Sequence, residues 1–147
     1  MSLCSVLAAS LVVVPDASAR GTGGIFAHAA HGDRAGCFDE AFGGIKNKCS
    51  GQEHAVIPVL LDTTNPPKVR VRARGLNRTQ GVSCQPLSVL DPNTGAFVVG
   101  STATTVRNNN TVEELNTAFP GVHSFGAFYV FCKLDPETVV LSAHYWE

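Results

Sequence analysis

Apolar and cationic residues alternate without a break in Lys68–Arg74, where valine or alanine fills every second position. Successive side chains of a β-strand point to opposite faces, so this pattern predicts a strand with an apolar inner face and a basic outer face. Alternate residues on one face of a strand lie about 6.5–7 Å apart, which spaces the cations evenly. The basic row consists of Lys68, Arg70, Arg72 and Arg74.

Two longer apolar runs, Phe125–Leu134 and Val139–Trp146, are joined by four residues that begin with Asp135 and Pro136. Both faces of the first run are mostly apolar, which is typical of a central strand of a sandwich. Proline presets φ at the first central position of a type I turn, and aspartate caps such a turn. The pattern therefore predicts a C-terminal β-hairpin.

Shorter runs between turn residues predict the remaining strands. They are His54–Asp62, Val82–Leu90 and Ala96–Val106. Pro86 indicates an edge position or a bulge in the second of these runs, because proline cannot donate a ladder hydrogen bond. The spacing in Thr111–Pro120 fits either a strand or a helical turn. Six or seven strands separated by turns predict an all-β fold, a single antiparallel β-sandwich of immunoglobulin-like or jelly-roll-like type.

The chain has 147 residues and a formal net charge of −1. This length fits one domain, and the near-neutral charge offers no electrostatic case for a specific nucleic-acid partner.

An apolar run near the start, Leu3–Val14, is short for a bilayer span and is followed by Pro15 and the small-x-small sequence Ala17-Ser18-Ala19. These features predict a secreted or periplasmic protein without a transmembrane segment in its mature chain. No lysine or arginine precedes the run, so a buried N-terminal helix or strand is the alternative. The predicted segments are a secretory signal peptide over 1–19, a glycine-rich flexible leader over 20–36 and the β-sandwich domain over 37–147.

Cleavage after Ala19 would remove Cys4 and leave an even number of cysteines, as expected for a disulfide framework in an exported chain. Four cysteines allow three pairings. We favour Cys37–Cys49, which closes a short local loop, and Cys84–Cys132, which ties the middle of the domain to the C-terminal runs. Zinc is the competing interpretation, but the sequence has no CxxC pair.

This cysteine frame resembles a loose group of small, exported, disulfide-stapled and mostly uncharacterised bacterial β-sandwich proteins. The similarity lies in the run Cys37–Cys49, the apolar strand that ends at Leu61-Asp62, the sequence Val82-Ser83-Cys84 and the cysteine of the C-terminal runs. It covers residues 37–147. The resemblance implies export and a β-sandwich, and it implies no activity and no functional residues.

The basic row is the strongest functional candidate. Guanidinium groups at strand spacing match sulfates, phosphates or carboxylates along an extended polyanion. The alternative is a solvated strand face that keeps a sheet edge soluble, with Asp62, Glu113 or Glu114 as neutralising neighbours. Arg78, in the loop that follows, adds a further cation. The predicted polyanion-binding residues are therefore Lys68, Arg70, Arg72, Arg74 and Arg78.

Two metal motifs are incomplete. His28 and His31 could share a helix face with Asp33 nearby, but the segment has poor helix signals, and a solvated leader is the simpler interpretation. The sequence from Asp91 to Gly95 resembles the start of a calcium loop, but its twelfth position is Thr102 rather than glutamate, so we predict a hairpin turn there. Neither a metal nor a cofactor is predicted.

No catalytic site emerges from the sequence. It has no Gly-x-Ser-x-Gly motif, no phosphate-binding glycine loop and no cysteine expected to stay free. Asp39 and Glu40 are adjacent, so on a strand they would point to opposite faces and could not act as a pair. The scattered histidines His54, His123 and His144 could join a triad only through the fold. We therefore do not predict an enzyme.

The expected function is an exported, non-catalytic binding or surface-associated module for polyanions or glycans, with acidic glycans, other polyanions or envelope proteins as the expected partners. Tyr145 and Trp146 could provide a sugar-stacking platform, although we expect at least one of them to be buried. The first alternative is a structural envelope or matrix protein that acts through protein partners. A hydrolase or a protease inhibitor is the second alternative.

Overall fold

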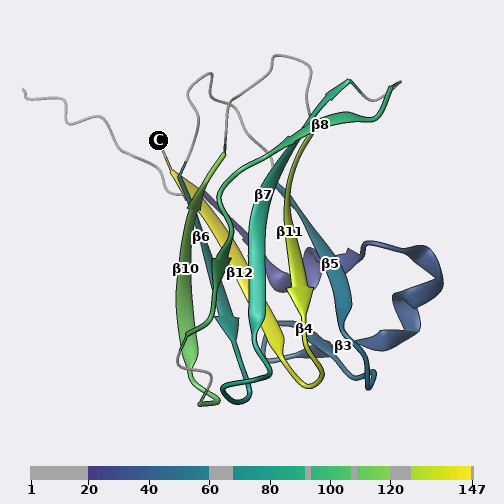
Figure 1. The fold of residues 1–147 in the computed structure, drawn as a ribbon, viewed down its shortest axis with the longest axis vertical. Coiled ribbons are helices and arrows are strands. Elements are labelled where there is room, and N and C mark those ends of the chain that lie inside the picture. Colours follow the sequence, from purple (N-terminus) through teal and green to yellow (C-terminus); the bar gives the residue numbers. More distant parts are fainter. Residues whose placement is uncertain (1–19, 60–67, 92–93, 107–108, 120–126, 147) are drawn as a thin grey trace, which may run out of the picture.

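The computed structural model describes residues 20–59, 68–91, 94–106, 109–119 and 127–146 as two β-sheets packed face to face (Figure 1). Sheet A contains β1 (Arg20–Gly23), β3 (Phe38–Ala41), β4 (Gly44–Asn47), β6 (Lys68–Arg74), β10 (Val112–Ala118) and β12 (Val139–Trp146). Sheet B contains β2 (His28–Ala29), β5 (Glu53–Val59), β7 (Val82–Asp91), β8 (Ala96–Val99), β9 (Ala103–Thr104) and β11 (Ala127–Leu134). Two short 3-10 turns occur, η1 (Gly24–Phe26) and η2 (Gly32–Cys37).

All pairings between these strands are antiparallel, which confirms the predicted sandwich. The strand order is β10-β6-β12-β4-β3 in sheet A, with β1 beside β12, and β2-β5-β11-β7-β8 in sheet B, with β9 beside β7. Alternate residues of the central strands form the core between the sheets. The fully buried ones include Val69, Val71 and Ala73 of β6 and Val130, Cys132 and Leu134 of β11.

The predicted C-terminal hairpin is wrong. β11 lies in sheet B and β12 in sheet A, so the four residues between them cross from one layer to the other. Each strand has neighbours on both sides. β11 lies between β5 and β7. β12 pairs with β6 on one side, and on the other side it pairs with β4 at its start and with β1 further along. A tight turn after a proline looks the same in sequence whether it joins neighbours in one sheet or facing layers.

Within residues 20–36, where we expected a flexible leader, two short strands belong to the sandwich. β1 pairs with β12 and β2 pairs with β5. A Cβ atom added to Gly24 would lie 2.6 Å from the carbonyl oxygens of Val140 and Leu141. At this position, therefore, glycine permits close packing on β12 rather than mobility. The predicted signal peptide lies outside the described residues.

β7 and β8 form the predicted hairpin, with Asp91 opposite Ala96 and Gly95 at φ +69°. The returning chain then leaves the ladder and rejoins β7 as β9. Pro86 lies at this interruption, where its carbonyl oxygen accepts from the Gly100 N–H at 2.8 Å. A Cβ atom on Gly100 would lie 2.1 Å from the carbonyl oxygen of Ala118, so this loop packs against the end of β10 in the other sheet.

Residues 112–118, ambiguous in the sequence, form a strand rather than a helical turn. β10 pairs with β6 along its whole length, from Val112 opposite Arg74 to Ala118 opposite Lys68.

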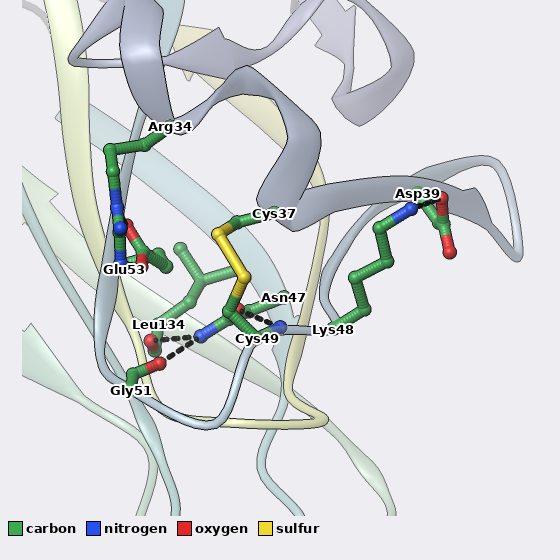
Figure 2. Close-up of a disulfide and its surroundings, with 9 residues drawn as sticks. All are labelled: Arg34, Cys37, Asp39, Asn47, Lys48, Cys49, Gly51, Glu53 and Leu134. Atoms are coloured by element: carbon green, nitrogen blue, oxygen red, sulfur yellow. Dashed lines mark hydrogen bonds and ion pairs between the residues drawn. A yellow bond between two sulfur atoms is a disulfide. The ribbon is translucent and has the colours of Figure 1, made fainter.

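Both predicted disulfides are present. Cys37–Cys49 joins the end of η2 to the loop after β4 (Figure 2). Cys84 and Cys132 are fully buried and lie directly opposite each other on β7 and β11, with Cα atoms 4.1 Å apart. The second bridge therefore joins neighbouring strands of sheet B and does not connect the two layers.

Beside the first disulfide, the fully buried Asn47 links the two sheets (Figure 2). Its Nδ2 donates to the carbonyl oxygens of Gly51 at 2.8 Å and Leu134 at 3.0 Å, while its Oδ1 accepts from the Cys49 N–H at 2.9 Å. Its backbone N–H donates to Thr138, and its carbonyl oxygen accepts from the Glu137 N–H. Every polar atom of this buried residue is thus satisfied, as burial requires.

Within the described residues, no helix is long and apolar enough to cross a membrane.

Candidate functional site

The basic row lies on the outer face of sheet A, as predicted. Lys68 and Arg72 are exposed and Arg70 and Arg74 are half-buried, whereas Val69, Val71 and Ala73 between them are fully buried. This alternation follows from strand geometry, because inward cations would have to lose their water in the core.

Neighbouring strands place further polar groups on the same face through their register. Glu114 of β10 and Ser142 of β12 lie opposite Arg72. Asn116 and His144 lie opposite Arg70, and Trp146 lies opposite Lys68. The row is therefore the centre of a mixed surface with cationic, acidic, amide, imidazole and indole groups.

Arg70 is held by three neighbours. Its Nη1 lies 3.3 Å from Glu114 Oε2, and its Nε donates to Asn116 Oδ1 at 3.4 Å. Its guanidinium carbon lies 5.0 Å from the centroid of the Trp146 ring, a cation–π distance. Arg70 thus fixes the position of the half-buried indole as well as occupying the surface itself.

The other cations of the row differ in the contacts that their side chains form. Arg74 lies over the Phe42 ring, 4.1 Å from its centroid. Arg72 and Lys68 form no ion pair and no hydrogen bond through their side chains within the described part of the chain. These two cations are free to meet a ligand.

A shallow hollow of about 330 Å³ opens on this face between Arg70, Arg72, Glu114, His144 and Trp146. Trp146 also borders a second depression of about 420 Å³, together with Lys68 and Asn116. Because Trp146 lines both, a ligand longer than one unit could pass along the indole. We call this surface the sheet A hollow.

The side chains of the sheet A hollow can bind a sugar or an acidic group such as a carboxylate or sulfate. An indole stacks on the apolar face of a ring, a carboxylate accepts from hydroxyl groups, and a guanidinium donates in pairs to carboxylate or sulfate. His144 is oriented by a hydrogen bond between its Nε2 and Ser142 Oγ, at 2.9 Å.

The structure separates Arg78 from the row. Arg78 lies in the loop between β6 and β7 and borders a different hollow, at the end of the sandwich. Tyr145 is 7% exposed and belongs to the core, so the prediction that at least one of the two terminal aromatics is buried is confirmed. Trp146 is the aromatic residue of the site.

The metal candidates do not converge into a binding set. The set considered in the sequence, His28, His31 and Asp33, does not form a close group of potential ligands among the described residues. One close group of three potential ligands occurs among the described residues, Cys37, Cys49 and Glu53, but both sulfurs are in the disulfide and Glu53 is paired with Arg34. The predicted hairpin turn near Asp91 includes positions outside the described residues.

The catalytic candidates are equally dispersed. His54 stacks on Phe131 with ring centroids 5.1 Å apart, and burial, aided by the charges of His31 and Lys133, lowers its pKa. His144 contacts Ser142, but no carboxylate bonds to it in the described part of the chain. A serine–histidine–acid triad is therefore not assembled there. His123 lies outside the described residues.

Sequence reasoning missed Asn116 and Ser142, and it listed His144 only as a catalytic candidate. Each is polar at an alternate position of its strand, which indicates an outward side chain. Which outward residues meet Arg70 and Arg72 depends on strand register across residues far apart in sequence.

No family model matches the chain, and no curated protein sequence matches it. Seven solved chains match this structure, and two of them follow. One is a carbohydrate-binding module, CBM6cm-2, from Cellvibrio mixtus lichenase 5A in complex with cellotriose, with a TM-score of 0.54 and 6% identity over 87% of this chain and 96% of that one. The other is TmCBM61 in complex with β-1,4-galactotriose, with a TM-score of 0.41 and 8% identity over 87% and 83% of the two chains. At these identities, the first likeness shows a shared β-sandwich fold.

Proposed function

We propose that this protein is a non-catalytic carbohydrate-binding module that takes acidic glycans in the sheet A hollow. The observation that carries the proposal is the pairing of an unpartnered cation with a fixed indole. Arg72 has no partner in the described chain, and Trp146 borders the same hollow under the guanidinium of Arg70.

The two groups have different roles in this proposal. Trp146 supplies apolar contact area to a sugar ring of either charge. Arg72 supplies a charge-assisted, bidentate hydrogen bond to a carboxylate or sulfate, which a neutral sugar cannot use. Glu114 accepts from hydroxyl groups, while its pairing with Arg70 leaves Arg72 to set the preference for acids.

The fold and the disulfides support the same proposal. A carbohydrate-binding module shares the sandwich architecture, and two disulfides fit an oxidising compartment such as the periplasm or the cell exterior, where structural polysaccharides occur. Fold alone does not determine function, so the residues of the hollow must be tested directly.

The test is calorimetric titration with a galacturonate oligosaccharide, a sulfated oligosaccharide and a neutral cello-oligosaccharide, at low and high salt. We expect salt-sensitive binding of at least one acidic ligand. Arg72→Ser should weaken that binding by about tenfold or more, because a charge-assisted bond contributes roughly 1.5–3 kcal/mol. Trp146→Ala should weaken binding of acidic and neutral sugars alike.

Arg74→Ser is the matched control, because Arg74 lies on the same strand and face but over Phe42, outside the hollow. It should leave affinity unchanged. Equal losses for Arg72→Ser and Arg74→Ser would indicate a general electrostatic surface rather than a site. If no acidic glycan binds, or if binding survives Trp146→Ala, the proposal is wrong.

A further inference from the structure

A separate polar hollow of about 320 Å³ lies where the β6–β7 loop meets the start of β7, strand β9 and the end of β11. It includes the one predicted cation that the structure removes from the basic row, Arg78. A second cation, Lys133 at the end of β11, borders it as well. We call it the loop-end hollow, and its volume is near the lower limit for small-molecule sites.

Hydrogen bonds brace the rim of this hollow. The Asn77 Oδ1 accepts from the backbone N–H groups of Thr79 at 2.9 Å and Gln80 at 3.0 Å, so the β6–β7 loop is braced from within. Gly81 and Asp135 then exchange hydrogen bonds. The Gly81 N–H donates to Asp135 Oδ2 at 2.8 Å, and the Asp135 N–H donates to the Gly81 carbonyl oxygen at 3.1 Å. The loop that carries Arg78 is therefore fixed to the strand that carries Lys133.

The lining of the hollow has two cationic side chains and one carboxylate, and neither cation is paired with that carboxylate. Arg78 and Lys133 are exposed and form no ion pair among the described residues. Asp135 is the one carboxylate among the described lining residues, and both of its oxygens are occupied, by the Gly81 N–H and by Gln52 Nε2 at 2.7 Å. Its oxygens organise the rim and do not neutralise either cation directly.

Hydroxyl groups complete the lining. Ser83 Oγ and Thr104 Oγ1 lie 2.9 Å apart, and their hydrogen bond uses only one of the two hydroxyl hydrogens. The other hydrogen is available to a ligand. Lys133 lies opposite Ser83 in the ladder, so the ammonium and the hydroxyl pair belong to one row that crosses β9, β7 and β11.

We infer that the loop-end hollow is an anion site, distinct from the sheet A hollow, that binds a compact oxyanion group through Arg78, Lys133 and the Ser83–Thr104 hydroxyl pair. The shared chemistry is that of a sulfate, phosphate or carboxylate group, either as a free ion or at the end of a larger molecule. A guanidinium that donates in pairs, an ammonium and a free hydroxyl are a donor set that such a group accepts and a neutral apolar ligand does not use.

The test follows amide chemical shifts of the full chain during titration with sodium sulfate, phosphate or acetate, at constant ionic strength maintained with chloride. Glucose 6-sulfate and glucose 6-phosphate form a second arm that separates a free ion from an anionic group on a sugar. We expect saturable shifts at Gly81, Ser83, Thr104 and Lys133 for at least one oxyanion. Lys133→Gln and Arg78→Gln should each weaken binding by about tenfold, as loss of a charge-assisted bond predicts.

Lys68→Gln is the matched control, because it removes an equally exposed cation from the other sheet. It should leave the oxyanion-dependent shifts at Gly81, Ser83 and Thr104 unchanged, and Lys133→Gln should leave glycan binding at the sheet A hollow unchanged. The two sites can therefore fail separately. Shifts that do not saturate, or that persist in the Arg78→Gln/Lys133→Gln variant while its thermal unfolding is unaltered, would overturn the inference.

Discussion

β6 and β11 each pair with a neighbouring strand on both sides, one in each sheet. They differ in how apolar and charged residues are distributed between their two faces. In β6, buried apolar residues alternate with cations, so the two faces differ sharply. In β11, Val130, Cys132 and Leu134 are fully buried, but the outer face also carries half-buried aromatic residues, Tyr129 and Phe131. One strand has a clear inside and outside, whereas the other is largely apolar on both faces.

The difference concerns how each strand finds its register. A slip of β6 by one residue would turn Arg70 and Arg72 into the core, at the high cost of desolvating unpaired charges. The same slip of β11 would exchange one largely apolar set for another and would bury a single cation, Lys133, so its side-chain pattern specifies its register less strongly than that of β6. Cys84 and Cys132, directly opposite each other, supply the missing constraint as a covalent bond. Charge sets the register in sheet A, and a disulfide supports it in sheet B.

The largest effect should come from breaking the pattern of β6. Val71→Lys puts an ammonium at a fully buried position with no partner, and we expect a loss of about 4 kcal/mol or more in the free energy of unfolding, enough to unfold many domains of this size. Arg72→Ser, one residue away on the outer face, should change it by less than about 0.5 kcal/mol. Denaturant unfolding of both variants measures the contrast, and equal effects would refute the two-faced description of β6.

The two disulfides should contribute different amounts to the free energy of unfolding. Cys84→Ala/Cys132→Ala opens a bridge with a sequence separation of 48, and we expect a loss of about 4 kcal/mol from chain entropy. Cys37→Ala/Cys49→Ala opens a separation of 12 and should cost about 3 kcal/mol. Urea unfolding of the two variants gives the order.

A second readout addresses register itself. Amide hydrogen exchange should accelerate along β7 and β11 in Cys84→Ala/Cys132→Ala and remain slow along β6. Uniform acceleration across both sheets would mean that this bridge stabilises the whole fold through entropy alone.

Asn47 of sheet A is hydrogen-bonded to Leu134 of sheet B. Its removal should lower the free energy of unfolding by an intermediate amount. Asn47→Ala deletes three side-chain hydrogen bonds and leaves the Leu134 carbonyl oxygen without this donor in a buried setting. We expect a loss of roughly 2–4 kcal/mol, since unsatisfied buried groups cost more than the net value of their bonds. Asn47→Asp should also destabilise, because a carboxylate cannot donate to Gly51 and Leu134. A tolerated Asn47→Asp would show that the shape of this side chain, rather than its donors, is what matters.

The smallest effect should be a mild acid sensitivity on sheet B. Burial and nearby cations lower the pKa of His54 in the folded protein, so the unfolded chain binds that proton more readily. The free energy of unfolding should therefore fall as the pH drops through the unfolded-state histidine pKa, near about 6.5. His54→Gln should flatten the dependence between about pH 7 and 5, as measured by urea unfolding at each pH. An unchanged slope in His54→Gln would assign the effect to other groups.

Glu53 should act in a lower range. The hydrogen bond from Arg34 lowers the pKa of Glu53, so its contribution to stability is present above its unfolded pKa and is lost as the pH falls through the folded value. Glu53→Gln should weaken this acid dependence below about pH 4.3. Because the Glu53 charge raises the pKa of the neighbouring His54, the same substitution should also lower that histidine pKa further.

β6 and β11 also differ in how much of their structure could be predicted from the sequence. β6 was predicted residue by residue, because alternation is a local property that the sequence displays directly. β11 was predicted as a central strand, but its relation to β12 was wrong, because the choice between one sheet and two layers depends on contacts distant in sequence. The disulfide pairings were correct, since loop length and the spacing of cysteines limit the options.

The candidate site was predicted in part for the same reason. The row of cations is local and was found, and Glu114 was named as a neutralising neighbour, which its ion pair with Arg70 confirms. His144 and Trp146 join the row only through the register of β12. Arg78 is adjacent to the row in sequence and was grouped with it, yet the turn after β6 carries it to another hollow. Asn47 was not singled out at all, because a buried asparagine looks like a loop residue until the chain segments around it are known.

The close approach of Gly100 to β10 has a consequence for encounters between molecules. A strand at the edge of a sheet offers unpaired backbone groups that another chain can extend into an aggregate. Here, Gly100 packs on the Ala118 carbonyl oxygen, and Ser101 is hydrogen-bonded to Thr117 through the two hydroxyl groups at 3.0 Å. The crossing between β8 and β9 thereby covers the final residues of β10 with the protein's own chain. A side chain at residue 100 would push that cover away, so this one glycine helps to keep the edge from recruiting a foreign strand.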